Sequence, residues 1–454
     1  MDISEYIVKG KTAHLAGIGG VSMSPLAEVL HSMGVVVQGS DMNESPVVEH
    51  LRSLGIPVTV GHAAENLGHC DFVVRTAAIR DDNPEISGAV TRGIPVFERA
   101  QAWGALMKGY ENALCVSGTH GKTTTTSMLT HIFMEAQRDP TVMIGGTLPL
   151  LNSGYRIGKG DTIIAESCEY CNSFLSFFPT VAILLNVEAD HLDFFKNLQN
   201  IEQSFRKFAE LVPDRGYVIA NSDDKGVCET LEGYARPVFR FSANDKNADC
   251  YADNLVWHNG LPAFDAVIGG KPYAHIVLNV GGMHNVSNAL AAASAAYLLN
   301  IPAAAVENGL LTFFGAGRRF EHKGTFNGAE IYDDYAHHPS ELHALLQMAK
   351  ALPYRRIICA FQPHTYTRTK ALFDDFVKEL KVPDLAIVAE IYAAREKNDI
   401  GISSADLCRE IPGSRYCSTL DEVTQILREN AREGDLILTV GAGDIFKAGE
   451  KLLQ

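Results

Sequence analysis

One short segment, residues 113–124, constrains the fold of this chain more than any other. A strand-like apolar run, Ala113–Ser117, leads into Gly-Thr-His-Gly-Lys-Thr-Thr, and a helix with a Met and Leu face follows. Glycines let backbone N–H groups turn inward around phosphate oxygens, and the helix N-terminus adds its dipole. A strand that passes through such a turn into a helix belongs to a parallel α/β sheet. The segment therefore predicts a phosphate-binding α/β domain.

The turn is a shortened P-loop. The usual pattern is G-x-x-x-x-G-K-[ST], and its first glycine is here Ser117 or absent. In that pattern Lys122 reaches the β- and γ-phosphates, and the Thr123 hydroxyl ligates Mg²⁺. A glycine turn with a solvated lysine is the simpler alternative, and both flanking elements speak against it. The predicted ATP-binding residues here are Gly118, Thr119, His120, Gly121, Lys122, Thr123 and Thr124.

Two acidic clusters follow predicted strands after the P-loop. Glu166 ends the strand-like run Asp161–Ala165, and Glu169 comes three residues later. The run Val181–Asn186 is followed by Glu188, Asp190, His191 and Asp193. A single strand-end glutamate is usually a solvated cap, but two clusters favour a magnesium site.

A second glycine turn lies near the N-terminus. Gly17-Ile18-Gly19-Gly20 follows the predicted strand Ala13–Ala16 and opens a helix, and Asp41 ends the next strand. This resembles a dinucleotide fingerprint without its third glycine, so NAD, FAD, another nucleotide diphosphate or only a tight turn all fit. An NAD-dependent oxidoreductase is the rival interpretation, but the strongest motif in the chain favours ATP.

The strand and helix patterns divide the chain into three blocks. We predict an α/β protein with an N-terminal Rossmann-like domain, a central P-loop ATPase domain and a C-terminal Rossmann-like α/β domain. The predicted boundaries are 1–103, 104–317 and 318–454, with a β-rich insertion at 238–280 in the central domain.

Composition excludes several classes of protein. A net charge of −15 argues against a nucleic-acid partner, and no apolar run is long enough for a membrane span. The start has no signal-peptide core, and nine scattered cysteines suit a reducing cytoplasm rather than a disulfide framework. The single C-x-x-C, Cys168 and Cys171, is a weak candidate for a redox or zinc pair.

Polar clusters also follow the predicted C-terminal strands, where an open parallel sheet binds ligands. Their alternative role is to cap helices in two polar loops. The clusters are Gly317–Glu321, Asp333–Pro339, Phe361–Thr369 and Gly441–Asp444. Asn285 and Asn288 open an alanine-rich helix, either as caps or as amides that contact adenine.

Together these motifs resemble the Mur ligases, which are ATP-dependent amide-forming enzymes of bacterial cell-wall precursor synthesis. The resemblance spans the chain in the order 17–20, 118–124, 188–191, 284–288, 317–320, 333–339 and 363–368. The turn at 17–23, followed by Gly39-Ser40-Asp41, is most similar to the branch that adds L-alanine to UDP-N-acetylmuramate. The branch that attaches a murein tripeptide to the same nucleotide sugar is the alternative.

The resemblance implies ATP and Mg²⁺ as cofactors, small-molecule substrates, a cytoplasmic location and a monomer or homodimer. It assigns catalytic roles to Lys122, His191, Arg319 and His337, and metal ligation to Thr123, Glu166 and His191. Asn285, Asn288, Arg319 and Asp334 would join the P-loop residues in binding ATP. The implied substrate-binding residues are Gly17, Gly19, Gly20, Ser40, Asp41, Thr76, His364 and Arg368. Thr365 stands where many members have arginine, which leaves Arg368 as the main cation for the amino-acid carboxylate.

Overall fold

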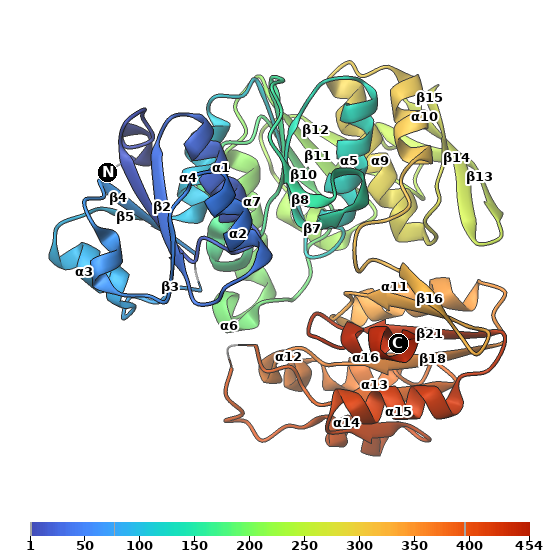
Figure 1. Cartoon of the computed structure of the whole chain (residues 1–454). Helices are drawn as coiled ribbons and strands as arrows, with labels where there is room; N and C mark the ends of the chain where they lie inside the picture. The colour runs from blue at the N-terminus through green and yellow to red at the C-terminus, as the bar shows by residue number, and fades with distance from the viewer. Residues whose placement is uncertain (1, 77, 395) are drawn as a thin grey trace. The chain divides into compact units, whose positions relative to one another are not determined.

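The computed structural model describes residues 2–76, 78–394 and 396–454, without the side chain of Asp193. The chain forms two compact units, Met1–Val187 with Glu202–Arg240 and Glu188–Ile201 with Phe241–Gln454. Both contain parallel strands joined by helices, so the predicted α/β class is confirmed (Figure 1).

The first unit opens with a fully parallel sheet in the order β3-β2-β1-β4-β5. Its central strand β1 is almost completely buried, as expected of a parallel strand covered on both faces. The elements are η1 (Ile3–Glu5), β1 (Thr12–Ala16), α1 (Ser24–Ser32), β2 (Val36–Asp41), α2 (Pro46–Ser53), β3 (Val58–Val60), η2 (Ala64–Leu67), β4 (Phe72–Arg75), α3 (Pro84–Thr91), β5 (Val96–Glu98) and α4 (Arg99–Met107).

A second set of strands in the first unit has the order β11-β10-β6-β9-β7-β8, and only β7 with β8 is antiparallel. The P-loop strand β6 thus lies between the two strands that precede the acidic clusters. The elements are β6 (Asn112–Ser117), α5 (Lys122–Glu135), β7 (Thr141–Leu148), η3 (Pro149–Leu151), β8 (Ser153–Arg156), β9 (Thr162–Glu166), η4 (Tyr170–Ser176), β10 (Val181–Leu184), α7 (Leu198–Glu210), β11 (Tyr217–Asn221), α8 (Lys225–Thr230) and β12 (Val238–Ser242). The chain changes unit within α7 and within β12.

The second unit begins with α6 (Leu192–Phe195) and then carries an antiparallel meander. The meander consists of β13 (Cys250–His258), β14 (Leu261–Ile268) and β15 (Lys271–Val277), which confirms the predicted β-rich insertion. The helices α9 (Met283–Leu298) and α10 (Ala303–Leu311) follow. The buried alanines of α9 allow it to pack closely against β13 and β14.

The C-terminal sheet has the order β16-β17-β21-β18-β19-β20, and only β16 with β17 is antiparallel. Apolar residues from both faces of these strands form two buried clusters under the helices. The elements are β16 (Glu321–Phe326), β17 (Ala329–Asp334), α11 (Pro339–Lys350), β18 (Arg356–Phe361), α12 (Tyr366–Ala371), α13 (Phe373–Glu379), β19 (Leu385–Ala389), α14 (Ser404–Glu410), β20 (Arg415–Cys417), α15 (Leu420–Asn430), β21 (Asp435–Val440) and α16 (Phe446–Leu453).

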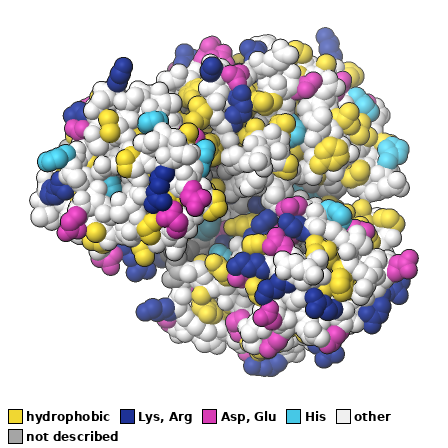
Figure 2. All heavy atoms as spheres, in the orientation of Figure 1, with side chains coloured by type: hydrophobic (Ala, Val, Ile, Leu, Met, Phe, Trp, Pro, Cys, Tyr) yellow, Lys and Arg dark blue, Asp and Glu magenta, His cyan; other side chains and the backbone are white. Residues whose placement is uncertain are grey.

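The surface and the helices of the described residues show two general features. On the face drawn in Figure 2, acidic and basic side chains are interspersed rather than gathered into one large basic area. Among the described residues, no helix combines the length and apolar character that crossing a membrane requires.

Candidate active site

The P-loop connects β6 to α5 through two glycines with positive φ angles. Gly118 has φ +151° and Gly121 has φ +81°. A Cβ at Gly118 would lie 2.9 Å from the Leu185 Cβ and 3.2 Å from the Asn186 backbone nitrogen. Glycine is therefore required at position 118 both by backbone conformation and by close packing.

Asn186 clamps the P-loop from the loop that follows β10. Its backbone carbonyl accepts the Thr119 N–H at 3.0 Å, and its Oδ1 accepts the His120 N–H at 2.6 Å. Its Nδ2 donates to the His120 carbonyl at 3.1 Å. The sequence placed Asn186 at the end of a strand without assigning it a role, and β10 in fact ends at Leu184.

Lys122 is folded back onto its own loop. The ammonium donates to the carbonyls of Gly118 and Thr119, and to Glu169 Oε2 at 3.1 Å. Burial alone would lower the pKa of Lys122, but the Glu169 carboxylate raises it above its usual value. The lysine is thus a buried, fully charged cation with a carboxylate counterion, positioned by the same loop that would hold phosphates.

Thr123 and Glu166 converge beside Lys122. The Thr123 hydroxyl donates to Glu166 Oε2 at 2.9 Å, and the Gly145 N–H donates to the same oxygen at 2.8 Å. A hydroxyl and a carboxylate are hard oxygen donors of the kind that Mg²⁺ binds, so these two residues fit the predicted ion. The third predicted ligand, His191, belongs to the other unit, and the complete metal set remains a prediction.

The N-terminal glycine turn is held by the end of β2. The Gly17 and Ile18 N–H groups both donate to the Ser40 carbonyl, at 2.8 and 2.9 Å. The Gly19 N–H donates to Asp41 Oδ2 at 2.9 Å, and the Gly20 N–H donates to the Gly17 carbonyl at 3.1 Å. The amides expected to cradle a diphosphate therefore already have acceptors within the protein.

A buried carboxylate holds Ser40, the residue whose carbonyl anchors this turn. Glu85 is fully buried and accepts the Ser40 hydroxyl at 2.6 Å and the Asn66 amide at 2.7 Å. His14 Nε2 and His62 Nδ1 lie 3.2 and 3.1 Å from its Oε2 atom. Burial acts to raise the pKa of Glu85, but the interactions with His14, Ser40 and Asn66 lower it to about 2.

Thr76, the remaining substrate-binding prediction in the N-terminal domain, follows β4 directly. Its hydroxyl accepts the Ala78 N–H at 3.0 Å. It therefore lies in the loop after the strand next to β1, at the same carboxyl edge as the glycine turn.

The two neighbouring arginines before β16 have different surroundings. Arg318 donates to Asp333 Oδ2 at 2.7 Å and to the carbonyls of Gly441 and Gly443, so it ties the sheet together. Arg319 lies 3.8 Å from Glu341, and its guanidinium lies over the Tyr335 ring. Arg319 thus has fewer strong partners than Arg318, and its contact to phosphate remains a prediction.

Asp334 ends β17 inside the fold. Its carboxylate accepts the Phe320 and Ala336 N–H groups, both at 2.8 Å. Burial raises the pKa of Asp334 to about 6, although Arg319 and the two N–H donors act in the opposite direction.

The predicted adenine-contacting residues pair within α9, where Asn288 Nδ2 donates to Asn285 Oδ1 at 3.2 Å.

Several predicted acceptor-binding residues of the second unit come together. The His337 and His364 rings are 5.7 Å apart, and Arg368 Nη1 lies 3.1 Å from His364 Nδ1. Arg368 also donates to Asp190 Oδ1 at 2.8 Å, so the pKa of Asp190, which burial would raise, is held well below its usual range. Burial lowers the pKa of His337 to about 3 and that of His364 to about 4, so both rings are neutral at neutral pH.

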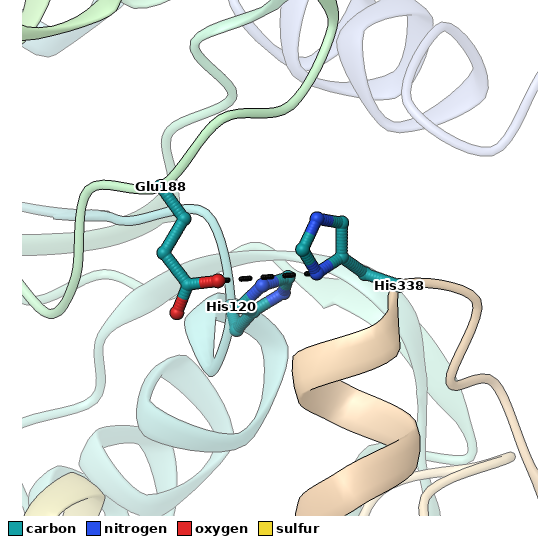
Figure 3. Close-up of side chains that lie close together, drawn as sticks. All are labelled: His120, Glu188 and His338. Carbon is teal, nitrogen blue, oxygen red and sulfur yellow. Dashed lines mark ion pairs between the residues drawn. The ribbon is translucent and has the colours of Figure 1, made fainter. Parts of the chain in front are cut away.

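The acidic segment before α6 has further contacts within the second unit. Glu188 Oε2 accepts the Ser340 hydroxyl at 2.8 Å and lies 3.9 Å from His338 Nδ1, the ion pair drawn in Figure 3. His191, with φ +51°, lies 3.7 Å from Asp190 Oδ2. Asp193, the last acid of this predicted cluster, lies outside the described side chains. The sequence motif located the segment but gave no reason to pair Glu188 with the start of α11.

Comparison with known protein families finds matches along the chain. Three family models match in succession: the Mur ligase family catalytic domain over residues 12–111, the Mur ligase middle domain over 116–296, and the Mur ligase glutamate ligase domain over 318–443. The succession confirms the three-domain architecture, while the predicted boundaries at 103/104 and 317/318 remain predictions.

Relatives match along nearly the whole chain. UDP-N-acetylmuramate–L-alanine ligase of Clostridium novyi is 44% identical and covers 98% of this chain and 97% of its own. The protein of that name from Caldanaerobacter subterraneus is 43% identical, with 98% of both chains covered. The crystal structure of UDP-N-acetylmuramate–alanine ligase from Thermotoga maritima has TM-score 0.81 at 30% identity, covering 97% of this chain and 98% of that one. This chain belongs to the Mur ligase family.

Proposed function

We propose that the chain joins L-alanine to the lactyl carboxylate of UDP-N-acetylmuramate in peptidoglycan precursor synthesis, with cleavage of ATP to ADP and phosphate. The carboxylate attacks the γ-phosphorus and ADP leaves, which gives an acyl phosphate. The alanine amine then attacks the acyl carbon, and phosphate leaves with formation of the amide bond. The full-length similarity to relatives that bear this activity in their names is the observation that carries the proposal.

The phosphoryl-transfer step uses the P-loop. Lys122 moves from the carbonyls of its own loop to the β- and γ-phosphates, and the amides at the start of α5 face the same oxygens. Charge neutralisation and alignment are the main requirements of phosphoryl transfer, and a fully charged lysine on a glycine-shaped loop meets both. Glu169 keeps this cation paired until the phosphates replace it.

Thr123 of the P-loop and Glu166 at the end of β9 are the residues that would hold Mg²⁺, since their oxygens lie 2.9 Å apart. Bound there, the ion would neutralise charge on the β- and γ-phosphates.

The acceptor is held by residues of the second unit. Arg368 is the cation for the alanine carboxylate, and Asp190 fixes the direction of its guanidinium. The neutral His337 and His364 rings accept hydrogen bonds from the incoming amine without repelling it. Arg319 stabilises the charge that develops on the transferring phosphoryl group.

Phosphate release by the purified protein tests the proposal. UDP-N-acetylmuramate, ATP and Mg²⁺ are supplied, and L-alanine, D-alanine or the murein tripeptide L-alanyl-γ-D-glutamyl-meso-diaminopimelate is then added in turn. We expect turnover with L-alanine. Turnover with the tripeptide alone would instead identify the recycling activity, and no release with any of these acceptors would contradict the proposed ligase.

Three accompanying properties remain part of the proposal. The small-molecule substrates require no nucleic acid or membrane partner, and the enzyme acts as a monomer or homodimer in the cytoplasm. The nine free cysteines are those expected in a reducing compartment.

A further inference from the structure

Arg99 is a partly buried cation without a paired carboxylate among the described residues. It is the first residue of α4 and donates to the Ser22 hydroxyl. The neighbouring acid, Glu98, accepts instead from Arg75 at 2.8 Å. Burial lowers the pKa of Arg99, and the nearby Cys168 and Glu98 side chains offset this only in part. Withdrawing an unpaired charge from water costs free energy, so stability alone does not explain this residue.

The fold places Arg99 at the N-terminal glycine turn. Helix α4 begins directly after β5, so its first residue lies at the carboxyl edge of the sheet that also carries the turn after β1. Trp103, one turn further along α4, donates from its indole Nε1 to the Ser22 carbonyl at 3.2 Å. Helix α4 therefore holds Ser22 by both its hydroxyl and its carbonyl, and the guanidinium is fixed beside the turn.

The four amides of residues 17–20 already have acceptors within the protein. The amides of Gly17, Ile18 and Gly20 donate to backbone carbonyls, and that of Gly19 donates to the Asp41 carboxylate. An anion that binds here meets a negative carboxylate and needs a cation from elsewhere. Arginine is suited to this task because its planar fork of N–H groups matches two oxygens of a diphosphate.

We infer that Arg99 binds the diphosphate of the nucleotide sugar. The inference rests on the proposed function, which brings a nucleoside diphosphate sugar to this turn. In the ligand-free protein the Ser22 hydroxyl occupies one donor of the guanidinium, and the diphosphate oxygens replace or join it. Lys122 serves the phosphates of ATP, and Arg99 serves those of the other substrate.

A binding experiment separates this assignment from its nearest competitor. Arg99 also lies near Cys168 in the loop after β9, and Glu169 of the same loop pairs with Lys122 of the P-loop. In the proposed reaction the lactyl carboxylate reacts at the P-loop. The lactyl carboxylate is therefore the other anion that Arg99 would meet. UDP carries the diphosphate but no lactyl group. Titration calorimetry of the full-length protein with UDP and with UDP-N-acetylmuramate, both without ATP, therefore reports on the two anions separately.

We expect Arg99→Gln to weaken both ligands by the same factor, about 10- to 100-fold, as for a lost charge-assisted hydrogen bond. Arg99→Lys should recover part of this loss, because it restores the charge without the fork. The ligand-free melting temperature of Arg99→Gln should stay the same or rise, since a poorly paired cation is removed. The matched control is Arg92→Gln: Arg92 is an exposed arginine that donates to the Gly68 carbonyl, and its replacement should leave UDP affinity unchanged.

Two results would overturn the inference. Unchanged affinity of Arg99→Gln for both ligands, with or without a lower melting temperature, would make Arg99 a structural residue. Unchanged affinity for UDP with weaker binding of UDP-N-acetylmuramate would assign Arg99 to the lactyl carboxylate. The proposed function fails separately, when the wild-type protein neither binds the nucleotide sugar nor turns over with L-alanine.

Discussion

The two glycine turns of the first unit share a local pattern of strand, turn and helix, but they are built for their ligands in different ways. In the N-terminal turn, the Ser40 carbonyl and the Asp41 carboxylate occupy the amides of residues 17–19. In the P-loop, Asn186 clamps the backbone of residues 119 and 120, and Lys122 lies folded against Glu169.

In each turn the backbone amides are held by residues at or just after the end of a neighbouring strand: Ser40 and Asp41 of β2, and Asn186 after β10. Each turn therefore has its shape before its ligand binds. The source of the cation differs. Lys122 belongs to the P-loop itself, whereas Arg99 reaches the N-terminal turn from a helix 82 positions after Gly17 (99 − 17). A change in one turn should therefore affect one nucleotide and leave the other unaffected, and this independence can be tested.

The largest effect is expected from Lys122→Ala. Removal of the cation that neutralises the γ-phosphate should lower kcat for phosphate release by about 10³-fold, a loss typical of a transition-state contact. Affinity for UDP, measured by calorimetry, should not change.

Lys225→Ala is the matched control, because Lys225 is exposed and pairs with Glu229 across one turn of α8, away from the P-loop motif. If Lys122→Ala also weakened UDP binding tenfold, the two turns would not be independent and the comparison would fail.

Glu85→Gln should give the next largest effect, on stability. A carboxylate with hydrogen bonds from Ser40 and Asn66 is replaced by an amide, so the free energy of unfolding should fall by about 2–4 kcal/mol, the range for breaking a buried charged network. Denaturant titration checks the loss, and UDP affinity should fall with it because Ser40 holds two amides of the turn.

The pH dependence of the wild-type protein gives an independent measure. The folded pKa of Glu85 is about 2, below the usual 4.5, so its contribution is complete above pH 4.5 and is lost as the pH falls toward 2. Glu85→Gln should show a flatter loss of stability across this window. An equally steep acid transition in the variant would mean that other carboxylates dominate it.

Local motifs explain why both turns were predictable. Glycine spacing, Lys122 and Thr123 lie within one short segment, and the strands before them are continuous apolar runs. The predicted strands Ala13–Ala16 and Ala113–Ser117 lie within β1 and β6, each of which begins one residue earlier. β7 and β8 were not predicted. The apolar run of β7 is cut short by two glycines, and β8 is polar, so their strand character comes from pairing with each other.

The supporting residues could not be predicted, because they depend on sheet order. Asn186 reaches the P-loop since β10 pairs with β6, and Glu169 reaches Lys122 since β9 pairs with β6 on the other side. Arg99 and Glu85 carry no motif at all. Their roles follow from the strand order β2-β1-β4-β5, which brings the carboxyl ends of distant segments together.

Glycine requirements provide a sharper test of the comparison. Gly118→Ala forces a side chain into φ +151° and against Leu185, so we expect a cost of about 1–3 kcal/mol and a loss of ATP affinity of about 10-fold or more. A Cβ at position 20 would lie 3.3 Å from the Gly17 carbonyl oxygen and 3.9 Å from the Met23 side chain, and Gly20 has no positive φ. We therefore expect Gly20→Ala to change UDP affinity less than about threefold. Comparable losses in the two variants, measured by calorimetry with each nucleotide, would show that both turns need glycine for the same reason.

The smallest effect expected among the variants that remove a charge, that of Asp41→Ala, concerns what the N-terminal turn does with its carboxylate. If Asp41 binds the ribose of the nucleotide sugar while it holds the Gly19 amide, its removal should weaken UDP binding about tenfold, or about 1.4 kcal/mol. The KM for ATP should not change, and Asp81→Ala, which removes a largely exposed acid paired with Arg75, serves as the control. Tighter binding of UDP to Asp41→Ala would have a different meaning: the carboxylate would then compete with the diphosphate for the Gly19 N–H. In that case the ligand-free turn is closed by its own anion, just as the P-loop is closed by its own cation, and Arg99 must overcome that repulsion when the nucleotide sugar binds.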